Sequence, residues 1–200
     1  PYLLNDNMRG LDGPDRFSAF FDEDFDSWVG PFIMAAINTR VVRRSAELLA
    51  GMYGRDFQYS EGTLTGQGAS GYIAATGMGV GSGVFAGLAS LSPTRSLLQK
   101  VLPKPGEGPS EDTMNNGFFD IEFLGIHPSD SSKNARVRVK GDKDPGYGST
   151  SKMIAESALA LAQDDLSVGG GFWTPASAMG NALLKRLPQS AGVTFDILEG

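Results

Sequence analysis

The sequence of 200 residues contains no cysteine and a single histidine, His127. Without cysteine, the chain can form neither disulfide bonds nor metal sites built on thiolates. One histidine excludes the paired-histidine metal motifs and any mechanism that needs two histidines. We therefore expect no metal in this chain, and we interpret His127, which precedes Pro128, as a loop residue.

Positive charge is also scarce. The 17 lysines and arginines are outnumbered by 23 acidic residues, which leaves a net charge of −6. Proteins that bind nucleic acids are usually basic, so we expect no nucleic-acid partner. The sequence begins at Pro1 without a charged-then-apolar leader, and we expect a cytoplasmic fragment of a longer protein.

The composition is that of an ordinary globular protein, with 40% hydrophobic and 20% charged residues. Residues 1–27 are polar and rich in Gly and Asp, which is typical of a connecting segment. Steps of three and four between apolar residues then predict a helix that is capped by Asp26-Ser27, becomes regular near residue 31 and ends at Gly51 and Gly54. Its apolar face consists of Ile33, Ile37, Val41, Ser45, Leu48 and Met52.

Four stretches of alternating residues predict strands. Two of them carry polar residues of opposite sign, and antiparallel pairing would place Glu122 opposite Arg138 and Asp120 opposite Lys140. The strands are predicted at residues 57–65, 119–123, 137–139 and 193–197.

Two helices are predicted in the second half of the chain. The "DPG" turn at 144–146 leads into a helix over residues 149–161. Thr174-Pro175 begins another, as a cap residue followed by proline at the first position, and Pro188 ends it. Strands in runs, without regular alternation with helices, predict an α+β fold. We expect a mostly antiparallel sheet of about four or more strands with helices packed on one face.

The stretch "TGMGVGSGVFAG" at 76–87 contains Gly81-x-Gly83-x-x-Ala86, which has the spacing of a dinucleotide-binding turn. Such a turn follows a buried strand and needs an acidic residue about twenty positions on. Here "GASGYIAAT" precedes it, and the proline-rich "KVLPKPGEGP" follows it. Because both requirements fail, we expect no cofactor-binding residues in this chain.

Residues 65–95 form a Gly/Ala-rich apolar segment, and no charged residue lies between Glu61 and Arg95. Small residues that repeat every four positions give a helix a flat face for close packing. This pattern predicts a tightly packed helix or a contact in a homodimer. The length of the uncharged stretch also raises the question of a membrane, and shallow, peripheral contact with a membrane or lipid is the alternative interpretation.

Four stretches, in order, carry a resemblance to a known family. They are "NTRVVRRS" (38–45), "YGRDFQYSE" (53–61), "GDKDPGYGST" (141–150) and "TPASAMGNALLKRL" (174–187). Through them the chain resembles the C-terminal half of the saccharopine dehydrogenase-like family, which includes the mycobacterial trans-acting enoyl reductases.

The resemblance implies a longer parent protein. Its N-terminal Rossmann domain, absent from this chain, would bind NAD(P) and would be the partner of this part. Residues 28–200 would then be a C-terminal domain for substrate binding and dimerisation, with residues 65–95 as its apolar insert. Hydride transfer by this chain alone is not expected.

Seven residues are candidates for binding a substrate. Arginines on the polar side of the first helix suit carboxylates or phosphates, although a solvated helix face or ion pairs explain them equally well. The turn at Asp144 precedes a helix N-terminus, where backbone N–H groups attract anions, and Tyr147 can donate a proton. For the other candidates, helix capping or side-chain packing is the alternative interpretation. The candidates are Asn38, Arg40, Arg44, Asp144, Tyr147, Trp173 and Thr174.

The leading functional hypothesis is the substrate side of an NAD(P)-dependent oxidoreductase that acts on a lipid or acyl intermediate. An amino-acid adduct, as in saccharopine-type dehydrogenases, is the alternative substrate. A non-catalytic domain for dimerisation or lipid association is the second hypothesis, and a soluble lipid-binding domain is the third.

Overall fold

A computed structural model describes residues 11, 13–54, 56–104 and 106–199. The chain divides into two compact units, Pro1–Glu107 and Gly108–Gly200. The division falls inside the range 28–200 that the sequence analysis treats as one domain. The first part of the predicted connecting segment, residues 1–10 and 12, lies outside the described residues.

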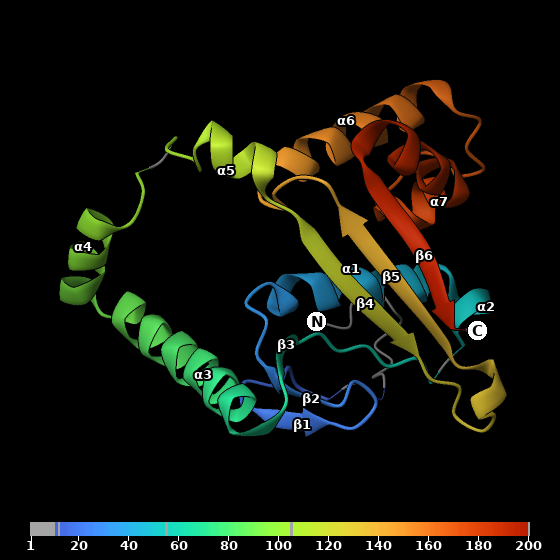
Figure 1. The fold of residues 1–200 in the computed structure, drawn as a ribbon. Coiled ribbons are helices and arrows are strands. Elements are labelled where there is room, and N and C mark those ends of the chain that lie inside the picture. The colour runs from blue at the N-terminus through green and yellow to red at the C-terminus, as the bar shows by residue number, and fades with distance from the viewer. Residues whose placement is uncertain (1–10, 12, 55, 105, 200) are drawn as a thin grey trace. The chain divides into compact units, whose positions relative to one another are not determined.

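The α+β class is confirmed, and the strands form two separate sheets. Each sheet has three antiparallel strands, in the order β1-β2-β3 in the first unit and β4-β5-β6 in the second (Figure 1). The elements of the first unit are β1 (Phe20–Asp22), β2 (Ser27–Gly30), α1 (Ala35–Leu48), α2 (Ala50–Tyr53), β3 (Thr63–Gly66), α3 (Gly68–Ser90) and α4 (Ser92–Val101). Those of the second are α5 (Glu111–Asn116), β4 (Phe119–Gly125), η1 (Ser131–Lys133), β5 (Ala135–Gly141), α6 (Gly148–Gln163), α7 (Pro175–Arg186), η2 (Leu187–Ala191) and β6 (Val193–Glu199).

The hairpin of β1 and β2 was not predicted, because its strands are short. Asp26 lies in its turn with φ +47°, so the expected helix cap at Asp26-Ser27 is wrong. The predicted strand at 57–65 is confirmed only over β3, and α1 begins at Ala35 rather than near residue 31.

Helix α1 turns its apolar stripe outward. Ile33, which precedes the helix, is 75% exposed, and Ile37 and Val41 are exposed as well. The buried side carries Thr39, which is 1% exposed, and Ser45. Both hydroxyls donate to the carbonyl four residues earlier, which satisfies them inside the helix.

Small residues attach the first half of α3 to the first sheet. A side chain at Gly71 would meet the carbonyl oxygen of Gly66 at 2.1 Å, and one at Gly79 would meet that of Phe17 at 2.8 Å. Ala75, between them, is completely buried. The stripe of small residues that packs is therefore at 71, 75 and 79, and it packs on the first sheet and on the segment before β1 rather than on a helix.

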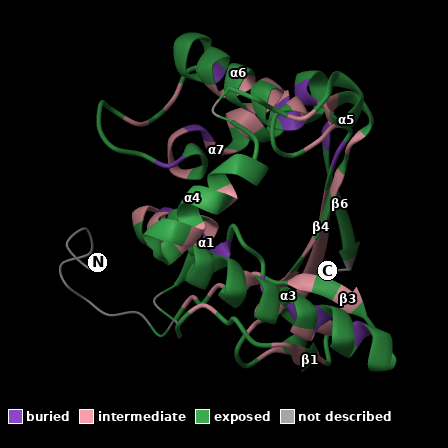
Figure 2. Cartoon of the chain, turned by 90° about the vertical axis from the view of Figure 1, so that its left-hand side faces the viewer, coloured by how far each residue is buried: buried purple, intermediate pink, exposed green. Residues whose placement is uncertain are grey.

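The second sheet has one apolar and one polar face. At one end of the apolar face, Val193 packs with Phe119 and Val139 against Leu187 and Met153 from the covering helices. The helices thus lie on one face of this sheet, as predicted. Figure 2 shows the few buried residues of the chain in purple.

The predicted register of β4 and β5 is confirmed. Asp120 lies opposite Lys140, and Glu122 lies opposite Arg138. The closest ion pair is nevertheless diagonal, because Arg138 donates two hydrogen bonds to Asp120, at 2.7 and 2.5 Å. The long, forked guanidinium reaches a diagonal neighbour, and its hydrogen bonds hold the pKa of Asp120 below the usual value.

Candidate functional site

Two of the sequence motifs meet in the first unit. The side-chain amide of Asn38, on α1, donates a hydrogen bond to the Glu61 carboxylate at 3.0 Å. The hydroxyl of Tyr59 is hydrogen-bonded to the same carboxylate. Arg43, one turn after Thr39, donates to the backbone carbonyl of Tyr59 at 3.0 Å. We call Asn38, Tyr59 and Glu61 the Glu61 cluster.

Burial and charge act together on Tyr59. The ring is half-buried, and removal from water opposes formation of the phenolate. The negative charge of Glu61 and its hydrogen bond to the hydroxyl act in the same direction, so the pKa of Tyr59 lies well above the ordinary value of 10.0. Tyr59 is consequently a stable hydrogen-bond donor rather than a base. Its ring stacks on Phe57, with centroids 6.5 Å apart.

The predicted arginines have different surroundings. Arg40 is exposed and lies 3.8 Å from Asp15, which is the kind of surface ion pair that contributes little to stability. Arg44 is half-buried on the same helix. Their predicted role in substrate binding stays a prediction.

The Asp144 turn is filled by its own carboxylate. Asp144 accepts hydrogen bonds from the backbone N–H groups of Gly146, Tyr147 and Gly148, at 2.8, 3.0 and 2.7 Å. These bonds lower the pKa of Asp144. The N-terminus of α6 therefore already has an internal anion, which competes with any external anion for the same donors.

Close packing explains the glycines of the same motif. A side chain at Gly148 would lie 2.6 Å from the carbonyl oxygen of Met114, and one at Gly141 would lie 2.0 Å from the ring of Phe119. Tyr147 itself is exposed. This geometry favours the interpretation of Asp144 as part of a turn that connects β5 to α6.

Thr174 caps α7, which confirms the predicted helix start. Its side chain accepts from the backbone of Ser177, whose hydroxyl accepts in return from the backbone N–H of Thr174 at 3.0 Å. Pro175 takes the first helical position, as predicted. The predicted end at Pro188 is not the end of the helical residues. They continue through η2, and Gly192 follows as the C-cap with φ +68°.

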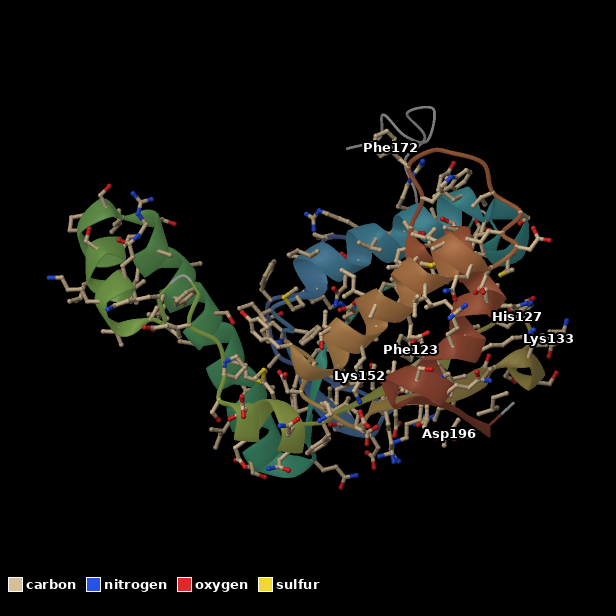
Figure 3. The ribbon with its side chains drawn as sticks, turned by 90° about the horizontal axis from the view of Figure 1, so that it is seen from above. Phe123, His127, Lys133, Lys152, Phe172 and Asp196 are labelled. Atoms are coloured by element: carbon tan, nitrogen blue, oxygen red, sulfur yellow. The ribbon has the colours of Figure 1, made fainter. Side chains whose placement is uncertain are left out.

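Trp173 lines a shallow cavity of about 450 Å³ between the end of α6 and the start of α7. Its ring nitrogen donates to the carbonyl of Gly169 at 2.9 Å, which closes the glycine-rich loop. Leu161, Asp164, Asp165 and Val168 are among the other residues of its wall. The preceding residue, Phe172, is 98% exposed and extends from this loop (Figure 3).

One carboxylate of this wall was not anticipated. Asp164 accepts from the guanidinium of Arg186 at 2.7 and 2.6 Å, and Glu156 lies 3.3 Å from the same arginine. The hydrogen bonds from Arg186 hold the pKa of Asp164 below the usual value. The sequence explained Arg186 only by the dipole of α7, because partners 22 and 30 residues away carry no local signal.

The predicted site residues are distributed over both units. Asn38, Arg40 and Arg44 belong to the first unit. In the second unit, Asp144 and Tyr147 lie at the start of α6, whereas Trp173 and Thr174 lie near its end. The 16 residues of α6 separate these pairs by about 24 Å, at 1.5 Å per residue. Each unit thus has its own candidate site, the Glu61 cluster in the first and the Trp173 cavity in the second.

The glycine spacing at 81–86 does not form a phosphate-binding loop. Gly81, Gly83 and Ala86 lie inside the continuous helix α3, where backbone N–H groups bond within the helix and cannot surround a phosphate. Within the described ranges, no group of three or more His, Asp or Glu side chains could hold a metal ion.

Comparisons with known proteins identify mycobacterial relatives. The chain is 46% identical over 177 residues to a Mycobacterium tuberculosis protein named "Putative trans-acting enoyl reductase Rv2449c", covering 84% of this chain and 41% of that protein. It is 39% identical to proteins named trans-acting enoyl reductase from Mycobacterium bovis and Mycobacterium ulcerans, covering 84% and 83% of this chain and 40% of each relative. No family model matches the chain, and no solved structure matches it significantly.

These relatives support an assignment to the enoyl-reductase-like family. The chain spans about 40% of the length of the relatives that it matches.

Proposed function

We propose that this chain is the substrate-side part of an NAD(P)-dependent enoyl reductase that acts on a lipid or acyl intermediate. The observation that carries the proposal is the match over 177 residues to proteins named trans-acting enoyl reductases. The placement of these proteins in the saccharopine dehydrogenase-like family, with a Rossmann domain in the rest of the parent, is part of the proposal. In this proposal the cofactor site belongs to that other part, since the Gly81-x-Gly83-x-x-Ala86 spacing of this chain lies inside helix α3.

Within this chain, the Glu61 cluster is the better candidate for contact with the acyl group. An amide nitrogen has two N–H donors, and Asn38 gives one of them to Glu61. This bond fixes the orientation of the amide and leaves its second N–H for an acyl carbonyl, whose developing negative charge a positioned donor stabilises. Glu61 would then be a positioning residue, and Asn38 would contact the substrate.

The full-length parent provides the test. We expect NADPH or NADH fluorescence to change on titration with the parent, and a 2-enoyl thioester to be reduced. Binding of neither nucleotide would refute the oxidoreductase proposal. Asn38→Ala should lower kcat by about a hundred- to a thousand-fold, the range for loss of one oxyanion donor. Lys133→Ala, in η1 on the other unit, is a control that should not change kcat.

Conservative replacement tests the role of Glu61. Glu61→Gln keeps an oxygen that can accept from Asn38, so it should retain most of the activity that Glu61→Ala loses. Equal losses in both variants would argue against positioning.

For the arginines, unchanged KM in Arg40→Ala and Arg44→Ala would remove these two residues from the substrate site.

A second function, association with lipid, is favoured by α3. Among the described helices, α3 alone is long and apolar enough to cross a membrane, and almost none of it is buried. A peripheral location at a membrane is therefore our proposal for this part of the chain. A homodimer and an amino-acid adduct as substrate stay predictions.

A further inference from the structure

Helix α3 consists of two halves with different surroundings. The first half is attached to the sheet through Gly71, Ala75 and Gly79, and Tyr72 packs on Trp28 with ring centroids 4.7 Å apart. Beyond Gly79, built side chains at Gly81, Gly83 and Gly87 would meet no atom within 4 Å. The second half thus extends past the sheet and packs on none of it.

Apolar side chains cover the free half and continue into α4. Val84 is 56% exposed, and other large apolar residues along this stretch are also exposed. In α4, Leu97 and Val101 lie about 40° apart around the helix and are exposed, and Arg95 and Lys100 flank this apolar stripe on its two sides. We call residues 80–104 the apolar arm. The exposed apolar residues of the arm are Val80, Val84, Phe85, Leu88, Leu91, Leu97, Val101 and Leu102.

The stretch that contains the apolar arm has a charge opposite in sign to the net charge of the whole chain. Between Glu61 and Glu107 there is no acidic residue, but there are three basic ones, Arg95, Lys100 and Lys104. All three are exposed, and in the described part of the chain none has an ion pair with an acidic side chain. A chain with a net charge of −6 thus presents a local surface that is apolar and positive. This combination matches an anionic lipid surface.

The length of the free half of α3 limits how deeply this helix can enter a bilayer. All 23 residues of α3 would rise about 34 Å, enough to cross a hydrocarbon core of about 30 Å. The attachment through Gly79 leaves only Val80–Ser90, which rise about 16 Å, close to half of that core. Full crossing would require the first half of α3 to leave the sheet.

We infer that the apolar arm inserts into a single leaflet of an anionic membrane, with α4 in the headgroup layer and its basic residues on the lipid phosphates. The inference rests on the proposed lipid association. It adds how deeply the apolar arm inserts and which lipids the arm prefers. The first half of α3 stays with the folded sheet outside the hydrocarbon.

Depth can be measured directly, because the chain contains no cysteine. A single cysteine at Val84→Cys or at Ile73→Cys carries an environment-sensitive dye. Ile73 is the matched control, because it is 68% exposed on the attached half of the same helix. With vesicles that contain one-third phosphatidylglycerol, we expect the dye at residue 84 to be shielded from aqueous iodide and quenched by spin-labelled acyl chains. The dye at residue 73 should stay accessible to iodide.

Lipid preference is tested by flotation with the same vesicles and with pure phosphatidylcholine. Arg95→Glu combined with Lys100→Glu should weaken binding to the anionic vesicles by about 25-fold or more, since each basic residue contributes about fivefold. Val84→Asp should abolish flotation, whereas Ile154→Asp, at an exposed apolar position of α6, should not.

Each contrary result would refute a specific part of this inference. Equal shielding at residues 73 and 84 would mean that α3 crosses the membrane, which refutes the single-leaflet inference and keeps lipid association. No flotation of the chain would refute both. If the 200-residue chain floats but the full-length parent does not, the rest of the parent covers the arm. Association into oligomers that protects residue 84 without vesicles would assign the arm to a second copy. None of these outcomes depends on nucleotide binding, so the reductase proposal is judged separately.

Discussion

Asn38 and Glu61 lie 23 residues apart in sequence, and their side chains meet at 3.0 Å. The bond joins α1 to the segment that precedes β3, and it brings together two of the motifs that carry the family resemblance. The same carboxylate holds Tyr59, so one charged group organises two polar side chains. This arrangement leads to a prediction that can be measured without a substrate.

Replacing Glu61 should lower the pKa of Tyr59. Wild-type Tyr59 should titrate well above its ordinary value of 10.0, because burial and the Glu61 charge both oppose the phenolate. In Glu61→Gln the charge is gone and burial remains, so the pKa of Tyr59 should fall but stay above 10.0. The measurement is an ultraviolet titration, with Tyr59→Phe subtracted to isolate this residue from the other four tyrosines.

The same shift links stability to alkaline pH. A raised pKa in the folded state means that the contribution of Tyr59 is complete below pH 10 and is lost as the pH rises through the folded-state value. Glu61→Gln should therefore lose less stability than wild type between neutral and alkaline pH. A Tyr59 titration that is identical in the two proteins would show that Glu61 does not act on this residue.

Asp144 should contribute to stability against acid. Its pKa is lowered by three backbone N–H donors, so its contribution is present above the unfolded value near 3.8 and is lost as the pH falls through the folded-state value. Unfolding by urea at pH 7 and near pH 3 should show a smaller acid-induced loss in Asp144→Asn than in wild type. Thr150→Ala, in the same motif without an ionisable group, should shift stability equally at both pH values. A similar acid-induced loss in wild type and Asp144→Asn would contradict this role.

Removing the cap of α7 should destabilise the second unit. Thr174→Ala leaves the backbone N–H of Ser177 without its partner, and loss of such a cap costs about 1 kcal/mol. Urea unfolding followed by Trp173 fluorescence, in a Trp28→Phe background, reports on this unit. Thr174→Ser keeps the hydroxyl and should remain near wild type. Equal stability of the alanine and wild-type proteins would rule out a capping role.

Gly141 should not tolerate a side chain. Its Cβ would lie 2.0 Å from the Phe119 ring, and overpacking of this kind costs about 1–3 kcal/mol. The control is Gly169→Ala, since a side chain at Gly169 would meet no atom within 4 Å. Phe119→Leu should recover part of the loss in a double variant. If both glycine variants were equally stable, close packing would not be the reason for this glycine.

The local features were predictable because neighbouring residues cause them. The alternation around Asp120 and Arg136 predicted β4 and β5 with the correct register, since a slip of one residue would turn the apolar residues to the polar face. Thr174-Pro175 predicted the start of α7 because capping depends on the residues within one turn. The repeat of small residues every four positions around Gly81 predicted a helix, and α3 confirms it.

Other features depended on partners that are distant in sequence. The stripe of Ile37 and Val41 is typical of a buried face, yet it is exposed, because the polar side of α1 bonds to Glu61 and to the carbonyl of Tyr59. Likewise, the sequence indicated small-residue packing in α3 but not which residues pack, since Gly66 and Phe17 had first to be placed beside it.

The sequence by itself determined the α+β class, the pairing of β4 with β5, the cap of α7 and the absence of cysteine chemistry. Periodicity, capping and composition act within a few residues, so they can be recognised without knowing the fold. Only the tertiary structure decided that Asn38 and Glu61 meet, that the candidate site residues separate along α6, and that α3 is free only beyond Gly79. These contacts join residues far apart in the chain, and no local pattern encodes such distances.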